Sequence, residues 1–203
     1  MKIISIIPCK EHSERLPNKN ILPINGKELF IHSIEFSLKN QIFPIVSTDS
    51  SHIIEYCQNN GISYYKETVD DSNMCNCIDQ VLSQYECDYF VLLQPTSPMR
   101  QDNLINQMGL PSTSIYTCDK VKIIGYIGDK FQTAYRDQDT STKFLYRFDG
   151  NAVIVNIAWY KKNHCLFNDE SKYFVENVPY SIQIDTQEEY NFLKLIMESN
   201  EVQ

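Results

Sequence analysis

Short apolar stretches typical of buried strands alternate with longer amphipathic stretches through the first half of the chain. The expected strands lie at residues 3–7, 43–47, 62–65 and 89–93, and the expected helices at 28–39, 52–60 and 77–85. Short apolar strands joined by helical crossovers are typical of βαβ units. The sequence therefore predicts an α/β fold in which helices cover both faces of a mostly parallel sheet.

The loop after the first expected strand is cationic, although the chain as a whole carries a formal net charge of −8. Pro8 ends the apolar run, and Lys10, Arg15 and Lys19 follow it. Ligands of open α/β sheets bind at the carboxyl ends of the strands. We therefore expect a phosphate-rich ligand here, although neither common glycine-rich phosphate motif is present. A solvated surface loop is the competing interpretation.

A second polar loop, Gln94-Pro-Thr-Ser-Pro-Met-Arg100, follows the expected strand 89–93. Its two prolines restrict the backbone, and its side chains offer an amide, two hydroxyls and a guanidinium. A rigid polar surface of this kind suits a sugar or the edge of a base. A proline-stiffened turn without a ligand is the alternative.

A third candidate is Asp185, which comes directly before an expected helix at 187–199. Thr186 and Glu189 have the T-x-x-E spacing of a capping box at the start of that helix. The Asp185 carboxylate has the chemistry of a ligand for a divalent metal. The alternative is an acidic residue that is favoured near a helix N-terminus by the helix dipole.

Composition excludes several classes of function. The acidic balance argues against general nucleic-acid binding, and no apolar stretch approaches the length of a membrane span. The seven cysteines are scattered and odd in number, which favours reduced thiols in the cytoplasm. We expect one domain over residues 1–203, in which residues 119–149 lack clean periodicity and form an arm or insertion.

Four blocks of the sequence, taken together, resemble the acylneuraminate cytidylyltransferases, which are also called CMP-sialic acid or CMP-nonulosonate synthetases. The blocks are IIPCKEHSERLPNKNILPINGKELF, VSTDS, VLLQPTSPMR and SIQIDTQEEY, in this order. The resemblance implies a three-layer, Rossmann-like fold of the nucleotide-diphospho-sugar transferase type. It also implies a homodimer in which a protruding arm of one subunit helps to close the site of the other.

The resemblance further implies that CMP is transferred from CTP to the anomeric hydroxyl of a nonulosonic acid, with Mg²⁺ assisting the release of pyrophosphate. By position, the implied catalytic residues are Lys10, Arg15, Lys19 and Asp185. The implied nucleotide-binding residues are Pro8, Lys10, Ser13, Arg15, Lys19 and Asn20. The implied sugar-binding residues are Gln94, Thr96, Ser97, Arg147 and Asn151, and Asp185 is the implied metal ligand.

The chain departs from the family pattern at several positions. Lys10 stands where the family has an arginine, Glu11 and His12 replace two glycines, and Glu14 replaces a cation. Gln183 stands where the family has the first of two metal-binding aspartates, which predicts weaker Mg²⁺ binding or a metal that arrives with the nucleotide. Two alternatives follow: a nucleotidyltransferase for another nucleotide or sugar acid, and a divergent relative that binds a nucleotide without transferring it.

Overall fold

The computed structural model describes residues 1–13, 15–68, 73–122, 124–127, 130–133 and 144–199. Glu14 and residues 134–143 of the predicted arm lie outside these ranges. The strands are β1 (Ile3–Pro8), β2 (Pro23–Ile24), β3 (Lys27–Glu28), β4 (Phe43–Thr48), β5 (Ser63–Lys66), β6 (Tyr89–Leu92), β7 (Ser114–Lys122), β8 (Ile124–Ile127), β9 (Lys130–Thr133), β10 (Phe144–Asn156) and β11 (Lys172–Glu176). The helices are α1 (Leu29–Lys39), α2 (Ser51–Asn60), α3 (Met74–Leu82), α4 (Leu104–Met108), α5 (Ile157–Asn163), α6 (Gln187–Ser199) and a 3-10 turn, η1 (Lys19–Ile21).

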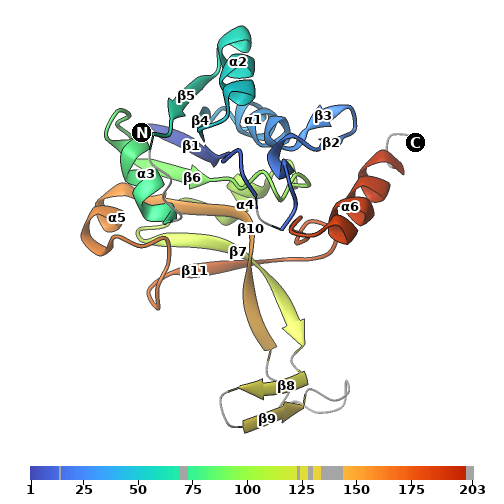
Figure 1. Ribbon diagram of the computed structural model, residues 1–203. Coiled ribbons are helices and arrows are strands. Elements are labelled where there is room, and N and C mark those ends of the chain that lie inside the picture. Colours follow the sequence, from blue (N-terminus) through green and yellow to red (C-terminus); the bar gives the residue numbers. More distant parts are fainter. Residues whose placement is uncertain (14, 69–72, 123, 128–129, 134–143, 200–203) are drawn as a thin grey trace.

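The main sheet has the strand order β11-β7-β10-β6-β1-β4-β5 (Figure 1). Strand β1 pairs in parallel with both β4 and β6, and β4 pairs in parallel with β5. Strand β10 is antiparallel to β6 and to β7, and β11 is parallel to β7. Only β10 therefore runs against the other strands of this sheet, which confirms the predicted α/β fold with its mostly parallel sheet.

Helices cover both faces of the sheet because its central strands are apolar on both sides. Ile4 and Ile6 of β1 pack on one face with α3 and α5, while Ile7 packs on the other face with α1, α2 and α4. Each of these three isoleucine residues is fully buried. The continuous apolar runs seen in the sequence are thus the pattern of a sheet buried on both faces.

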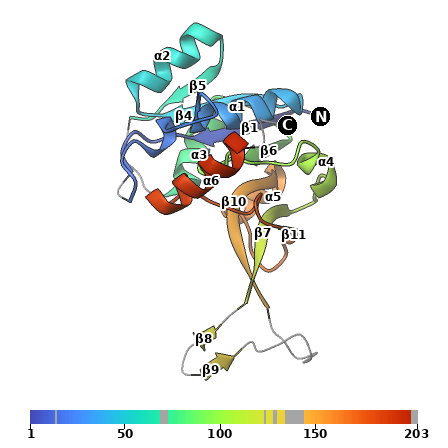
Figure 2. The ribbon, with the colours of Figure 1, turned by 90° about the vertical axis from the view of Figure 1, so that its right-hand side faces the viewer.

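A smaller core joins the end of the chain to its beginning. Leu193 and Tyr190 of α6 pack with Leu16, Ile24 and Leu29 of the N-terminal segment. The Tyr190 hydroxyl also donates to the Pro23 carbonyl at 2.6 Å. Helix α6 therefore lies against the loop that follows β1, beside the edge of the sheet where the parallel strands end (Figure 2).

Strands β7 and β10 continue beyond the sheet as a long antiparallel pair (Figure 1). Their register shifts between Phe148 and Val153, where β10 bulges. The short hairpin of β8 and β9 lies beyond the outer ends of this pair, away from the body of the protein. The described part of the expected arm is therefore built from β7 to β10.

The predicted strands and helices of residues 1–93 all form, with ends that differ by a few residues. The sequence did not predict α4 or α5, since helices of five and seven residues are too short to show a clear helical period. It also did not predict the edge strand β11. Within the described residues, no helix is both long enough and apolar enough to cross a membrane.

Candidate active site

The candidate site lies where the order of the parallel strands reverses direction. From β1 the chain moves to one side of the sheet through β4 and β5, and it then returns to place β6 on the other side of β1. The carboxyl ends of β1 and β6 flank this switch point, where ligands of open α/β sheets bind. The cationic loop after Pro8 and the polar loop after Leu93 leave the sheet at these two positions.

A cleft of about 600 Å³ opens at this switch point. It is lined by the first loop, the start of α3, the Gln94 loop and the segment before α6. The lining residues are Pro8, Lys10, His12, Ser13, Arg15, Lys19, Asn20, Glu67, Asn73, Met74, Cys77, Gln94, Pro95, Thr96, Gln183 and Asp185. Three cations in this acidic protein thus face one cleft, which concentrates positive potential where an anionic ligand would enter.

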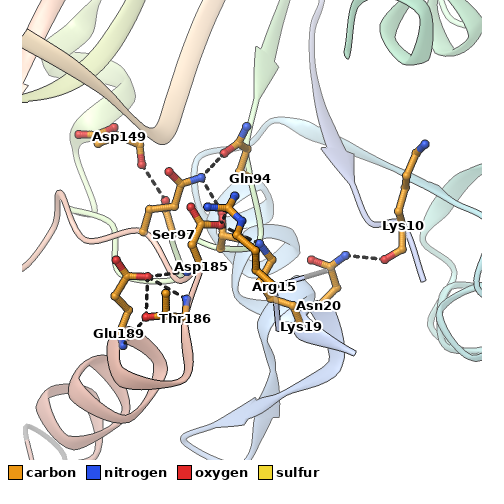
Figure 3. Close-up of polar contacts among 12 residues, drawn as sticks. Lys10, Arg15, Lys19, Asn20, Gln94, Ser97, Asp149, Asp185, Thr186 and Glu189 are labelled. Carbon is orange, nitrogen blue, oxygen red and sulfur yellow. Dashed lines mark hydrogen bonds and ion pairs between the residues drawn. The ribbon is translucent and has the colours of Figure 1, made fainter. Parts of the chain in front are cut away.

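Two of these cations converge on a single carboxylate (Figure 3). Lys19 Nζ donates to Asp185 Oδ1 at 2.9 Å, and Arg15 Nη2 lies 3.1 Å from the same oxygen. The Lys19 and Asp185 side chains are largely buried, whereas that of Arg15 is 68% exposed. Arg15 is therefore free to turn toward an incoming anion, while Lys19 and Asp185 form the fixed part of the cluster.

The position of Asp185 depends on the start of α6. Glu189 Oε2 accepts hydrogen bonds from the backbone N–H groups of Asp185 at 2.8 Å and Thr186 at 2.9 Å. Thr186 Oγ1 in turn accepts from the Glu189 N–H at 3.3 Å, which completes the predicted capping box (Figure 3). On the other side, the Ile184 N–H donates to the Thr96 carbonyl at 2.7 Å, so this segment is tied to the Gln94 loop.

An amide pair forms the wall of the cleft next to β6. Gln183 Nε2 donates to Gln94 Oε1 at 2.8 Å and to Thr96 Oγ1 at 3.2 Å. The bulge of β10 lies directly behind the pair, where Gly150 has φ +74°, and a Cβ on this residue would lie 2.4 Å from Gln94 Oε1. Glycine is required here both by the left-handed backbone and by the lack of space.

A buried polar network holds the Gln94 loop against β10. Arg100 donates to the carbonyls of Gln94 at 2.7 Å and Asn151 at 3.0 Å, and its guanidinium lies 5.5 Å from the centre of the Phe36 ring. The Ser97 hydroxyl donates to the Asp149 carbonyl at 3.2 Å. The guanidinium that the sequence offered as a ligand contact is therefore turned inward, where it fixes the loop.

Two buried carboxyl groups lie behind this wall. Asn151 Nδ2 donates to Glu176 Oε2, and the Thr117 hydroxyl donates to Asp149 Oδ1. Burial raises the pKa of Glu176 to about 7, with a further contribution from the charge of Asp149, and burial likewise raises the pKa of Asp149. The Glu176 carboxyl group, which lies behind the amide wall, therefore changes its protonation state near neutral pH.

The structure brings most of the residues implied by the resemblance into this cleft and leaves three of them outside its lining. The nine that line it are Pro8, Lys10, Ser13, Arg15, Lys19, Asn20, Gln94, Thr96 and Asp185. Ser97 and Asn151 are buried behind the wall. Arg147 lies at the base of the arm and pairs with Asp119, its Nη2 2.8 Å from Asp119 Oδ2.

Other cleft residues were not selected as site residues from the sequence. Glu67 directly follows β5, and Cys77 comes from α3; both line the cleft beside Lys10. Glu67 could have been found by the rule that placed the Lys10 loop, because it follows the carboxyl end of a parallel strand. Cys77 could not, since only the packing of α3 brings its side chain to this edge.

The residues present fit a magnesium ion that is shared with a nucleotide. Within the described residues, no group of three or more His, Cys, Asp or Glu side chains could hold a metal by itself. Mg²⁺ commonly binds through one or two carboxylates, substrate phosphates and water, and Asp185 supplies one carboxylate in the cleft. Asp49, a second carboxylate close to the carboxyl end of β4, does not line the cleft, and its Oδ1 accepts from the Glu11 N–H at 2.7 Å.

Comparison with known proteins shows the family to which the chain is similar. A family described as "Cytidylyltransferase" matches residues 4–198. The N-acylneuraminate cytidylyltransferase of Streptococcus agalactiae serotype V is 29% identical over 219 residues, covering 94% of this chain and 52% of that protein. The chain thus spans about half the length of this relative.

Two further similarities extend over whole chains. The CMP-N,N'-diacetyllegionaminic acid synthase of Legionella pneumophila is 24% identical over 99% of this chain and 98% of its own length. A solved structure of CMP:2-keto-3-deoxy-manno-octonic acid synthetase complexed with CTP has a TM-score of 0.74 at 16% identity, covering 98% of this chain and 100% of that one. This last similarity shows the fold.

Proposed function

Because the chain belongs to the cytidylyltransferase family, we propose that it transfers CMP from CTP to the anomeric hydroxyl of a nonulosonic acid and releases pyrophosphate. The observation that carries the proposal is the convergence of Arg15 and Lys19 on Asp185, in a cleft whose facing wall is the Gln94–Gln183 amide pair. The cations suit a triphosphate, and the amides suit the hydroxyl and carboxylate groups of a sugar acid.

The reaction needs positioning and charge neutralisation more than covalent chemistry by the protein. The acceptor hydroxyl attacks the α-phosphorus while the bond to the β-phosphate breaks, and negative charge shifts onto the leaving pyrophosphate. Lys10, Arg15 and Lys19 would stabilise that charge, with Pro8, Ser13 and Asn20 shaping the nucleotide-binding side of the cleft. Asn20 has a visible structural role, since its Nδ2 donates to the Lys10 carbonyl at 2.8 Å.

The acceptor would bind against Gln94, Thr96 and Gln183, which are already joined by hydrogen bonds before a ligand enters. Such preorganised groups lose little freedom on binding. Ser97 and Asn151 support this wall from behind. Arg147 would contact the sugar acid from the base of the arm. Asp185 is the residue that would hold Mg²⁺, and Mg²⁺ bound there would neutralise part of the charge of the triphosphate.

We further propose a cytoplasmic homodimer. The location is supported by the seven cysteines, all of which are free thiols. The dimer is supported by the β7–β10 pair, which extends beyond the sheet and leaves the side chain of Arg147 70% exposed at its base. Analytical ultracentrifugation of the purified protein measures the oligomeric state directly.

A coupled assay of pyrophosphate release tests the activity with CTP, Mg²⁺ and a panel of sialic, legionaminic, pseudaminic and ketodeoxyoctonic acids. We expect turnover with at least one nonulosonic acid and none without an acceptor. CTP could stabilise the folded protein against thermal unfolding while none of these acids is turned over. The protein would then be a nucleotide-binding relative without transferase activity.

A further inference from the structure

A buried carboxylate lines the cleft at the side away from the amide wall. Glu67 directly follows β5, is 7% exposed and faces the same cleft as Lys10 and Gln94. Three strand spacings separate β5 from β6. At about 4.8 Å for each spacing, Glu67 lies roughly 14 Å along the sheet edge from the Gln94 loop. This distance leaves room for the reacting phosphate and sugar groups between the two side chains.

The Glu67 side chain is held through only one of its oxygens. Oε1 accepts from the Ser47 hydroxyl at 2.8 Å and from the Cys77 thiol at 3.4 Å. Burial raises the pKa of Cys77 to about 12, so this thiol keeps its proton and remains a donor at neutral pH. No hydrogen bond from another described residue reaches Oε2. One oxygen is therefore fixed in place, and the other can accept from a ligand.

The rest of the cleft indicates which part of a nucleotide would reach Glu67. Arg15 and Lys19 suit the phosphates, and Gln94 and Gln183 suit the acceptor, which leaves the nucleoside for the side of the cleft next to β5 and α3. There the side chains of Met74 and Cys77, both partly apolar, line the cleft together with Glu67. An apolar surface beside a carboxylate that is held in place suits a flat base that carries a hydrogen-bond donor.

We propose that Oε2 of Glu67 accepts a hydrogen bond from the exocyclic amino group of cytosine and thereby selects CTP over UTP. This inference rests on the proposed function, because it concerns how the cleft would recognise the base of the nucleotide substrate. A carboxylate accepts hydrogen bonds and cytosine donates from N4, whereas uracil presents the acceptor O4 at the same position. With UTP, two acceptors would face each other and Oε2 of Glu67 would be left without a donor.

The test is the substitution Glu67→Gln, assayed for kcat/KM with CTP and with UTP and for the thermal stabilisation that each nucleotide produces. A glutamine amide can turn its NH₂ group toward O4 of uracil. We therefore expect the ratio of CTP to UTP activity to fall by about 100-fold or more. Ser47→Ala keeps the carboxylate but removes a donor that fixes it, and we expect a smaller fall in the same direction.

Glu55→Gln is the matched control, since Glu55 is exposed on α2 and should keep the selectivity of the native protein. A folded Glu67→Gln protein with unchanged preference for CTP over UTP would overturn the proposal. So would a change in discrimination between CTP and 2′-deoxy-CTP with no change for UTP, since Glu67 would then contact the ribose. Nucleotide-dependent stabilisation reports base selection without turnover, so the inference can fail or succeed separately from the transferase activity.

Discussion

Lys19 and Asp185 are 166 positions apart in the sequence, and Lys19 Nζ donates to Asp185 Oδ1 at 2.9 Å. The contact exists because α6 packs onto the N-terminal segment through Leu193, Tyr190 and Leu16. The same carboxylate also pairs with Arg15. Asp185 thus balances two cations when no ligand is bound. In the proposed reaction, the triphosphate of CTP would offer these cations new partners, and Asp185 would become available to a metal.

Substitution of Lys19 by glutamine removes one of these cations. We expect Lys19→Gln to lower kcat/KM for CTP by about 100- to 1000-fold, because charge that develops on the phosphates loses a preorganised donor. Steady-state kinetics with varied CTP measures the loss. Lys39→Gln is the control, since Lys39 pairs with Asp102 on the surface. Equal activities of the two variants would contradict the role of Lys19.

Glu189 is expected to position Asp185 through the capping box. Glu189→Ala should cost about 1 kcal/mol of stability as a lost helix cap, and it should lower kcat because the Asp185 backbone loses its acceptor. Glu188→Ala removes the same charge from the same helical turn and is the control. Glu189→Gln keeps an acceptor oxygen and should recover most of the activity. If Glu189→Gln were as impaired as Glu189→Ala, charge rather than positioning would explain the effect.

Gly150 is expected to be required both for the left-handed backbone conformation and for binding of the sugar acid. Gly150→Ala places a Cβ 2.4 Å from Gln94 Oε1, whereas Gly61→Ala, at a similar φ of +66°, meets no atom within 4 Å. Both substitutions should cost about 1–3 kcal/mol in backbone strain, measured by chemical denaturation. Only Gly150→Ala should raise KM for the sugar acid, because only that variant displaces the amide pair. A matching rise in Gly61→Ala would contradict this prediction.

Stability should depend on pH through Glu176. Its folded-state pKa of about 7 lies above the ordinary value of 4.5, so the folded protein holds a proton that the unfolded chain has released between these values. The contribution of Glu176 to stability is present below pH 4.5 and is lost as the pH rises to about 7, by up to about 3 kcal/mol. Denaturation curves measured from pH 5 to pH 8 test this slope.

Glu176→Gln should flatten that slope, because the amide carries no ionisable proton while it can still accept from Asn151. Glu35→Gln, on an exposed carboxylate paired with Lys27, should leave the slope unchanged. A slope that persists in Glu176→Gln would assign the pH dependence to other groups, of which Asp149 is the first to examine, because burial raises its pKa as well.

The amino-acid sequence by itself determined the layered α/β fold and the principal loops of the site. Apolar runs such as residues 3–7 are long enough to show that a strand is buried on both faces, so the sheet and its ligand-binding edge followed from local patterns. The Thr186–Glu189 capping box is also local, and the structure contains it as predicted. Family resemblance located Lys10 and Gln94, both of which line the cleft.

Only the tertiary structure decided which side chains meet in the cleft. Glu67 and Cys77 reach it through the packing of β5 and α3, while Asn151 is turned behind the wall by the bulge of β10. From the sequence, Gln183 could be recognised only as a departure from the aspartate of the family pattern, whereas in the structure its side chain donates a hydrogen bond to Gln94. These outcomes depend on contacts between distant segments, and no local period or propensity in a single sequence encodes such contacts.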